Sequence, residues 1–158
     1  MRFETMVLTM ALGAALAAQS GLDQRLTVAD VEKVAGVAGV KTVARMSQPG
    51  AGGQLNFVSS DNKLLLMVNF GDAQLYKKAR EQKEMKVGGK SYPMEIFAHA
   101  IPGLGDEAFD APPGNVQYVL YVRKGDKAIS ISTYLAKMKP RLTVAQLEAL
   151  ARTILSRW

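Results

Sequence analysis

Two pairs of apolar segments, each joined by a short turn, place the strongest constraint on how this chain folds. In residues 53–70 the two segments flank Ser60-Asp61-Asn62, a combination that favours a turn. In residues 115–134 they are joined through Gly125-Asp126, and glycine in the first central position suits a two-residue type II′ turn. Both regions are therefore predicted to be β-hairpins.

The last predicted strand, residues 127–134, carries a clear alternation. Apolar or β-branched side chains at every second position predict a strand with one face in a core and the other face open to water. The inward set is Ile129, Ile131 and Thr133, and the outward set is Ser130, Ser132 and Tyr134. This pattern indicates an antiparallel sheet, and residues 92–100 read as a further strand.

Two short segments carry helix-capping patterns. Thr27 and Asp30 form a capping box, and Gly36 supplies the left-handed stop. The same capping pattern recurs at Thr143 and Gln146, where a second helix is predicted to begin and to extend to residue 157. The second helix has an apolar stripe at helical spacing, which predicts packing on a core: Leu147, Leu150, Ala151, Ile154 and Trp158.

A third helix is predicted over residues 72–85, with Asp72 as its cap. Each hairpin is thus followed by a helix, and residues 53–58 match residues 114–119 in register. Two interpretations remain open: a duplicated β-β-α unit, or a coincidence of strand patterning. Under either, the chain is predicted to be an α+β domain, with an antiparallel sheet and helices packed chiefly on one face.

The N-terminal segment differs from the rest of the chain. Residues 6–18 are uncharged and apolar, too short to span a bilayer comfortably, and Ala15-Leu16-Ala17 fits the A-x-A cleavage rule. We expect a signal peptide at residues 1–18, a linker at 19–25 and a single domain at 26–158. The alternative is an N-terminal core helix. Cleavage implies an exported protein, periplasmic or extracellular, with no transmembrane span in the mature chain.

The amino-acid composition limits the kinds of site that this chain can form. The chain has 158 residues, is 48% apolar and 22% charged, and carries a net charge of +6. These values fit one globular domain, and the positive charge favours anionic partners. Because the chain has no cysteine, a disulfide framework, a thiolate metal site and a cysteine nucleophile are excluded.

One motif carries a resemblance. The segment Gly103-Leu-Gly-Asp-Glu-Ala-Phe109, followed by a hairpin containing Leu120-Tyr-Val-Arg-Lys-Gly-Asp126 and a closing leucine-rich helix, resembles an uncharacterised secreted or lipoprotein-type domain of bacteria. The resemblance covers about the C-terminal third of the chain and lacks the lipobox cysteine of the lipoprotein versions. It implies export and this fold, and it says nothing about activity.

The same motif has two physical interpretations. In the first it is a shaped corner, in which Asp106 accepts hydrogen bonds from backbone amides and Phe109 fills the core. In the second, Asp106, Glu107 and Asp110 form a carboxylate cluster for a cation, but they lack the ligand ladder of a calcium loop. We favour the corner and predict no metal ion and no cofactor.

An enzyme is the weaker functional hypothesis. The chain has a single histidine, His99, and no Gly-x-Ser-x-Gly nucleophile elbow or phosphate loop. A small hydrolase or lyase would have to use His99 with a carboxylate such as Glu95 or Asp106. His99 and the acidic residues of the motif define a possible polar cluster: His99, Asp106, Glu107 and Asp110.

The stronger hypothesis is a non-catalytic binding module of the cell envelope. The predicted helix at 72–85 and the residues after it are rich in lysine and arginine, which at a bilayer attract anionic headgroups. The alternative is that these basic residues form an ordinary solvated helix face with no binding role. An envelope protein, an apolar small molecule bound on the open sheet face, or an anionic surface could be the partner; nucleic acid is disfavoured because no set of aromatic residues is interleaved. The basic candidates are Lys77, Lys78, Arg80, Lys83 and Lys86.

Overall fold

The computed structural model describes residues 21–43, 52–82, 84–87, 89–93, 98–111, 117–136 and 139–158. The expected signal peptide at 1–18 lies outside these residues, as do Lys83 and Glu95. The elements are α2 (Val28–Ala35), β1 (Lys41–Val43), β2 (Gln54–Val58), β3 (Leu64–Asp72), α3 (Ala73–Glu81), β4 (Glu84–Val87), β5 (Lys90–Pro93), β6 (His99–Ala100), β7 (Glu107–Ala111), β8 (Gln117–Lys124), β9 (Lys127–Ala136), β10 (Lys139–Pro140) and α4 (Val144–Ser156).

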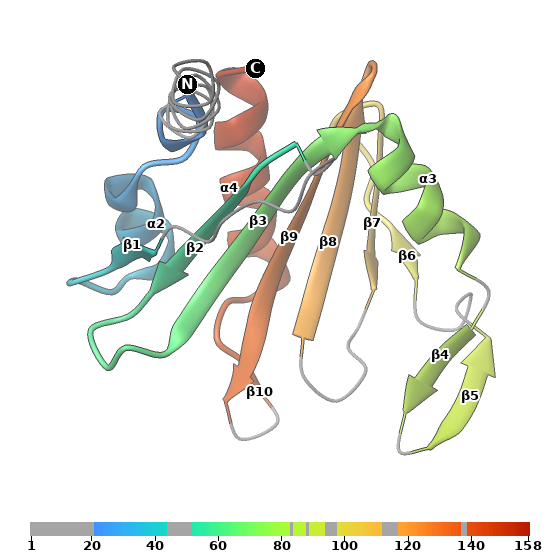
Figure 1. Ribbon diagram of the computed structural model, residues 1–158, viewed down its shortest axis with the longest axis horizontal. Helices are drawn as coiled ribbons and strands as arrows, with labels where there is room; N and C mark the ends of the chain where they lie inside the picture. Colours follow the sequence, from blue (N-terminus) through green and yellow to red (C-terminus); the bar gives the residue numbers. More distant parts are fainter. Residues whose placement is uncertain are drawn as a thin grey trace, which may run out of the picture.

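The main sheet is antiparallel and has the strand order β1-β2-β3-β9-β8-β7-β6, with β10 paired to β9 (Figure 1). Both predicted hairpins are confirmed, as β2–β3 and as β8–β9 with Gly125-Asp126 between them. The α+β class is therefore confirmed. No helix in the described part of the chain is long and apolar enough to cross a bilayer.

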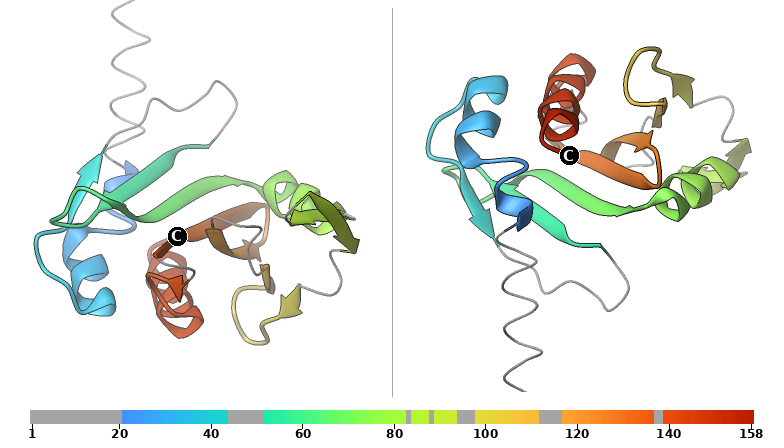
Figure 2. Two further views of the ribbon diagram at one scale, coloured as in Figure 1. Left: turned by 90° about the horizontal axis from the view of Figure 1, so that it is seen from below. Right: turned by 90° about the horizontal axis from the view of Figure 1, so that it is seen from above.

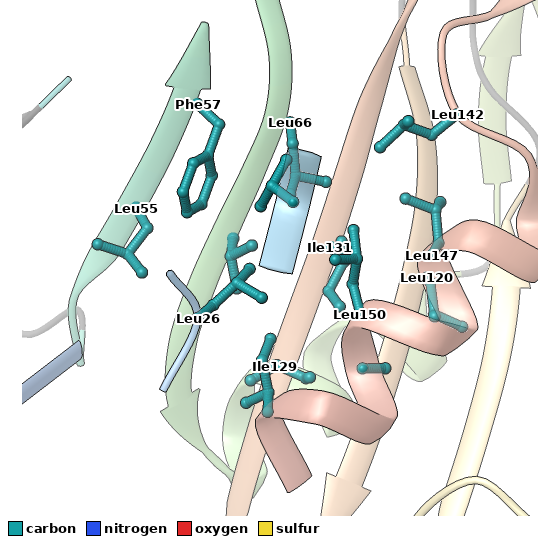
Figure 3. Packing of buried hydrophobic residues seen from close by; sticks show 14 of the residues in the cluster. Leu26, Leu55, Phe57, Leu66, Leu120, Ile129, Ile131, Leu142, Leu147 and Leu150 are labelled. Atoms are coloured by element: carbon teal, nitrogen blue, oxygen red, sulfur yellow. The ribbon is translucent and has the colours of Figure 1, made fainter. Parts of the chain in front are cut away.

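The main core lies between the sheet and two helices, α2 and α4, which cover the same face (Figure 2). Side chains from β2, β3, β8 and β9 share one core cluster with the apolar stripe of α4, as Figure 3 shows for Ile131, Leu147 and Leu150. The predicted stripe is buried at Leu147, Leu150, Ala151 and Ile154, and Trp158 is partly buried against it.

The caps of α2 and α4 are formed as the sequence predicts. Thr27 and Asp30 make a reciprocal capping box, and Gly36 ends α2 with a φ of 68°. Thr143 and Gln146 repeat this arrangement at the start of α4. The caps therefore define where each helix begins, and packing on the sheet supplies most of its stability.

Strand β9 differs from the expectation of one wet face. Ile129, Ile131 and Thr133 lie in the core as predicted, but Ser130 and Ser132 are also buried, with 4% and 2% of their surface exposed. These serines are buried because β9 lies at the centre of the sheet, between β3 and β8. Ser130 also accepts a hydrogen bond from Asn69. The second face is therefore not an open platform at this strand.

The third helix is shorter than expected. Asp72 caps it by accepting a hydrogen bond from the Gln74 amide, as predicted, but α3 ends at Glu81 instead of residue 85. Residues Glu84–Val87 form β4, which pairs with β5 in a separate two-stranded sheet. A glycine turn allows this pairing, because Gly89 adopts a φ of 79° between Val87 and Lys90.

The strand pairing agrees with a duplicated unit, but the helices do not. β3 and β9 lie side by side, so the two hairpins are arranged symmetrically in the sheet. However, α4 packs on the face that carries Ile129, whereas α3 places Tyr76 in a second, smaller cluster with Ala128. Adjacent strand residues point to opposite faces, so the two β-β-α units are not equivalent.

Residues 21–25, which the sequence assigned to a linker, pack against the domain. They form a short helical turn, Leu22 is 8% exposed, and Arg25 lies over the Phe70 ring at 6.0 Å. Gly53 leaves space for this contact, because a Cβ there would lie 2.1 Å from a methyl group of Leu22. Leu22 therefore belongs to the main core.

Candidate functional site

Strand β7 separates the two groups of residues that could carry a function. Its register with β8 places Phe109 beside Tyr121 and Asp110 beside Leu120. Because successive side chains alternate, Phe109 points towards α3 while Asp110 points to the face that α4 covers. The carboxylate-cluster interpretation grouped Asp110 with the motif that ends at Phe109. The structure places these two neighbours on opposite faces of the sheet.

The loop before β7 is a corner, in the way that the first interpretation of the motif expects. Asp106 accepts a hydrogen bond from the Gly125 amide at 2.7 Å, and its own amide donates to the Arg123 carbonyl. Gly105 has a φ of 64°, and a Cβ there would lie 2.4 Å from that carbonyl oxygen. Phe109 is 1% exposed. The corner thus fastens β7 to the β8–β9 turn.

The three motif carboxylates do not converge. Asp106 and Glu107 both approach Arg123, at 3.6 and 3.5 Å, while Asp110 lies on the other face. No group of three or more metal-ligating side chains occurs in the residues that the structure describes. The predicted cluster is therefore divided into two carboxylates that share Arg123 and a separate buried carboxylate.

A groove of about 350 Å³ lies between α3 and this corner. One side is formed by Tyr76 and Arg80 of α3, and the other by residues 100–102 and 106–109. Ring contacts support it: Tyr76 meets Phe109 edge-on at 5.3 Å, and Phe109 stacks on Tyr121 at 5.0 Å. The volume is within the range of small-molecule sites.

Arg80 is the basic side chain that lines this groove. Its guanidinium lies 5.4 Å from the centre of the Phe109 ring, a cation–π contact. Among the described residues it makes no ion pair, whereas Lys77 pairs with Glu81 at 3.8 Å. Arg80 therefore belongs with the groove more than with the outer basic face of α3.

The pKa of the Tyr76 hydroxyl reflects burial and the charges that surround the groove. Tyr76 is 7% exposed, and burial raises the pKa of its hydroxyl, with the negative charge of Glu107 adding to the effect. The hydroxyl thus stays protonated at neutral pH and is available as a hydrogen-bond donor.

The second group joins His99, Asp110 and Tyr118. The His99 Nδ1 atom lies 3.2 Å from Asp110 Oδ1, and the His99 amide donates to the same oxygen. The Tyr118 hydroxyl donates to the other carboxylate oxygen. The His99 side chain is 68% exposed and that of Asp110 only 10%. An exposed imidazole is therefore held by a buried carboxylate.

This arrangement defines the state of each member. Because an ionised carboxylate only accepts, the His99 Nδ1 atom is the donor in its contact with Asp110. Burial, followed by the hydrogen bond to Asp110, raises the pKa of Tyr118, so that its hydroxyl remains a donor. Glu148 of α4 adds to the negative field at Tyr118. The group resembles the base and its orienting acid in a catalytic triad.

The basic candidates are distributed over two elements. Lys77 and Lys78 are exposed on α3, and Lys86 lies on β4 instead of on the predicted helix. The paired strand β5 adds Lys90, and Tyr92 there is one of the exposed large apolar side chains, at 37%. Figure 1 shows α3 and the β4–β5 hairpin together at one end of the molecule, away from α2.

Sequence reasoning missed Tyr76 and Tyr118 as site residues. Tyr118 is eight residues from Asp110, and only the register of β7 with β8 brings them together. The expected partners of His99 were Glu95 and Asp106; Asp106 instead binds Gly125, and Asp110 takes the role. Comparison with protein-family models, curated proteins and solved structures finds no match for this chain. Function is therefore argued from these two groups and the basic surface.

Proposed function

We propose that this protein is an exported, non-catalytic binding module that docks on an anionic surface of the cell envelope, namely a bilayer containing acidic phospholipid. The observation that carries the proposal is the basic end formed by α3 and the β4–β5 hairpin. We name this surface, with the exposed Lys77, Lys78 and Lys90, the basic end.

Charge and exposure support it. From Asp72 to Pro93 the chain has six lysine or arginine residues and three carboxylates. Lys77, Lys78 and Lys90 are exposed. Each basic side chain near an anionic bilayer contributes about 1 kcal/mol, and the exposed ring of Tyr92 suits the headgroup region.

Export is supported by sequence alone. The apolar run at 6–18 ends in a cleavage-type pattern, and the motif at Gly103–Phe109 resembles secreted bacterial domains. Intact-mass measurement of the protein expressed with its own first residues tests this. Loss of about 17 residues together with recovery from the periplasm is expected. A full-length protein in the cytoplasmic fraction would contradict export.

Vesicle flotation tests the docking. The protein is mixed with vesicles of phosphatidylglycerol and phosphatidylcholine, and with phosphatidylcholine alone. We expect binding only to the anionic vesicles, and weaker binding as salt rises. The double variant Lys77→Gln/Lys78→Gln should bind at least about tenfold more weakly, since two charges contribute about 2 kcal/mol.

A matched control removes the same charge elsewhere. Lys33 and Lys41 are also exposed, and they lie on α2 and β1. Lys33→Gln/Lys41→Gln should retain most of the vesicle binding. Equal loss in both double variants would mean that net charge, and not the basic end, drives binding, and the proposal would fail.

A second candidate function rests on His99, Asp110 and Tyr118. An imidazole oriented by a buried carboxylate can act as a general base, so a small hydrolase or lyase is the alternative. Panels of ester, phosphate and glycan substrates test it. Turnover that disappears in His99→Ala and falls in Asp110→Asn would support this function. Absence of turnover on all panels would leave the cluster a structural one.

A further inference from the structure

We infer that the groove beside α3 binds a small zwitterion of the amino-acid type, an apolar amino acid or dipeptide with a free amino group and a free carboxylate. This site is distinct from the basic end. The groove is lined by Tyr76, Arg80 and the corner before β7, whereas Lys77 and Lys78 do not line it. Ligand binding and surface docking can therefore be measured separately.

Arg80 is suited to the carboxylate of such a ligand. Its guanidinium is held over the Phe109 ring and has no ion-pair partner among the described residues. A planar guanidinium binds a carboxylate through two parallel hydrogen bonds, and the ring behind it reduces the freedom lost on binding. The Tyr76 hydroxyl on the preceding helical turn is a further donor.

Glu107 is suited to the amino group. Its Oε2 atom lies 3.5 Å from Nε of Arg123, and its side chain is 55% exposed. Arg123 thus contacts only one oxygen, and the carboxylate can still accept from an ammonium group. Asp106 is less available, because its Oδ2 atom already accepts from the Gly125 amide and faces Arg123.

The presence of both charges in one groove selects a zwitterion. A simple anion would meet the repulsion of Asp106 and Glu107 on the opposite side, and a simple cation would meet that of Arg80. Between the charged groups, Ile101 and Pro102 provide apolar surface for a side chain. A volume of about 350 Å³ is enough for a dipeptide and too small for a folded partner.

Isothermal titration of the full chain tests the ligand class. The probes are phenylalanine and leucyl-leucine, each compared with its N-acetyl and C-terminal amide derivatives. We expect the free forms to bind, and each blocked form to bind about tenfold more weakly or worse, because one charge-assisted hydrogen bond is lost. No binding of any free probe, or equal binding of free and blocked forms, would overturn the inference.

Variants locate the binding. Arg80→Gln and Glu107→Gln should each weaken binding of the free dipeptide about tenfold, and Arg80→Gln should remove the preference for a free carboxylate. Lys78→Gln, on the same helix but outside the groove, should bind the dipeptide like the unchanged protein. Circular dichroism checks that each variant folds. If Lys78→Gln loses as much affinity as Arg80→Gln, the binding does not involve the groove. Vesicle flotation of the same samples reports docking independently.

Discussion

The imidazole Nδ1 atom of His99 lies 3.2 Å from Oδ1 of Asp110, and the two residues face each other across the β6–β7 pair. The carboxylate is buried, and its other oxygen accepts from Tyr118. This relationship fixes the edge of the sheet, since β6 is the last strand in the described part of the sheet and has only two residues.

Replacing Asp110 by asparagine should destabilise the protein. The amide group of asparagine turns a donor towards donors that the carboxylate satisfied, and an unsatisfied buried group costs about 1–3 kcal/mol. The free energy of unfolding in urea measures this. Asp126→Asn is the control, because Asp126 is exposed in the β8–β9 turn and its hydrogen bond to Ala73 uses only the backbone carbonyl. A similar loss in both variants would contradict the prediction.

Gly105→Ala should be more harmful than Gly103→Ala. Both glycines have positive φ values, 64° and 72°, so any side chain adds about 1–2 kcal/mol of backbone strain. At Gly105 the new Cβ would also lie 2.4 Å from the Arg123 carbonyl oxygen, whereas at Gly103 the space is open. Thermal unfolding of the two variants should therefore give a clearly lower midpoint for Gly105→Ala. Equal midpoints would show that the corner adjusts to the extra atom.

Leu150→Ala should cost about 2–5 kcal/mol of unfolding free energy, because Leu150 is completely buried between α4 and the sheet and its removal leaves a cavity. Leu155→Ala on the same helix is the comparison, since Leu155 is only partly buried. It should lose clearly less stability in the same urea titration. If the two losses are alike, α4 does not pack on the sheet with the face described above.

The ion pair between α2 and α4 should make stability depend on pH in acid. Arg157 donates to both carboxylate oxygens of Asp30, at 2.6 and 2.9 Å. Hydrogen bonds from Arg157 and Thr27 hold the pKa of Asp30 well below its usual range. Because the folded-state value is depressed, the stabilisation is present above the ordinary value of about 3.9 and is lost as the pH falls below it.

Asp30→Asn checks this assignment. Its stability should fall less than that of the unchanged protein between pH 5 and pH 2, although it is less stable at neutral pH. Urea midpoints at several pH values provide the measurement. Parallel curves for the two proteins would show that another carboxylate is responsible.

Features whose interacting residues lie close together in the sequence were predicted, whereas features that depend on distant residues were not. The caps at Thr27 and Thr143, the stripe of α4 and the two hairpins were predicted, because their partners lie within a few residues of each other. Strand β7 was missed. β7 contains Ala108 and Asp110 and has little intrinsic strand preference, so that it forms because β8 pairs with it.

By itself, the sequence determined the class of the fold, the positions of its turns and the basic character of residues 72–93. These follow from local periodicity, from the backbone freedom of glycine and from charge. Only the tertiary structure decided that β9 is central and buried on both faces, that α3 lies opposite α4, and that Asp110 rather than Asp106 meets His99. Strand order and register are set by long-range packing, and a shift of one residue would exchange the faces of Phe109 and Asp110.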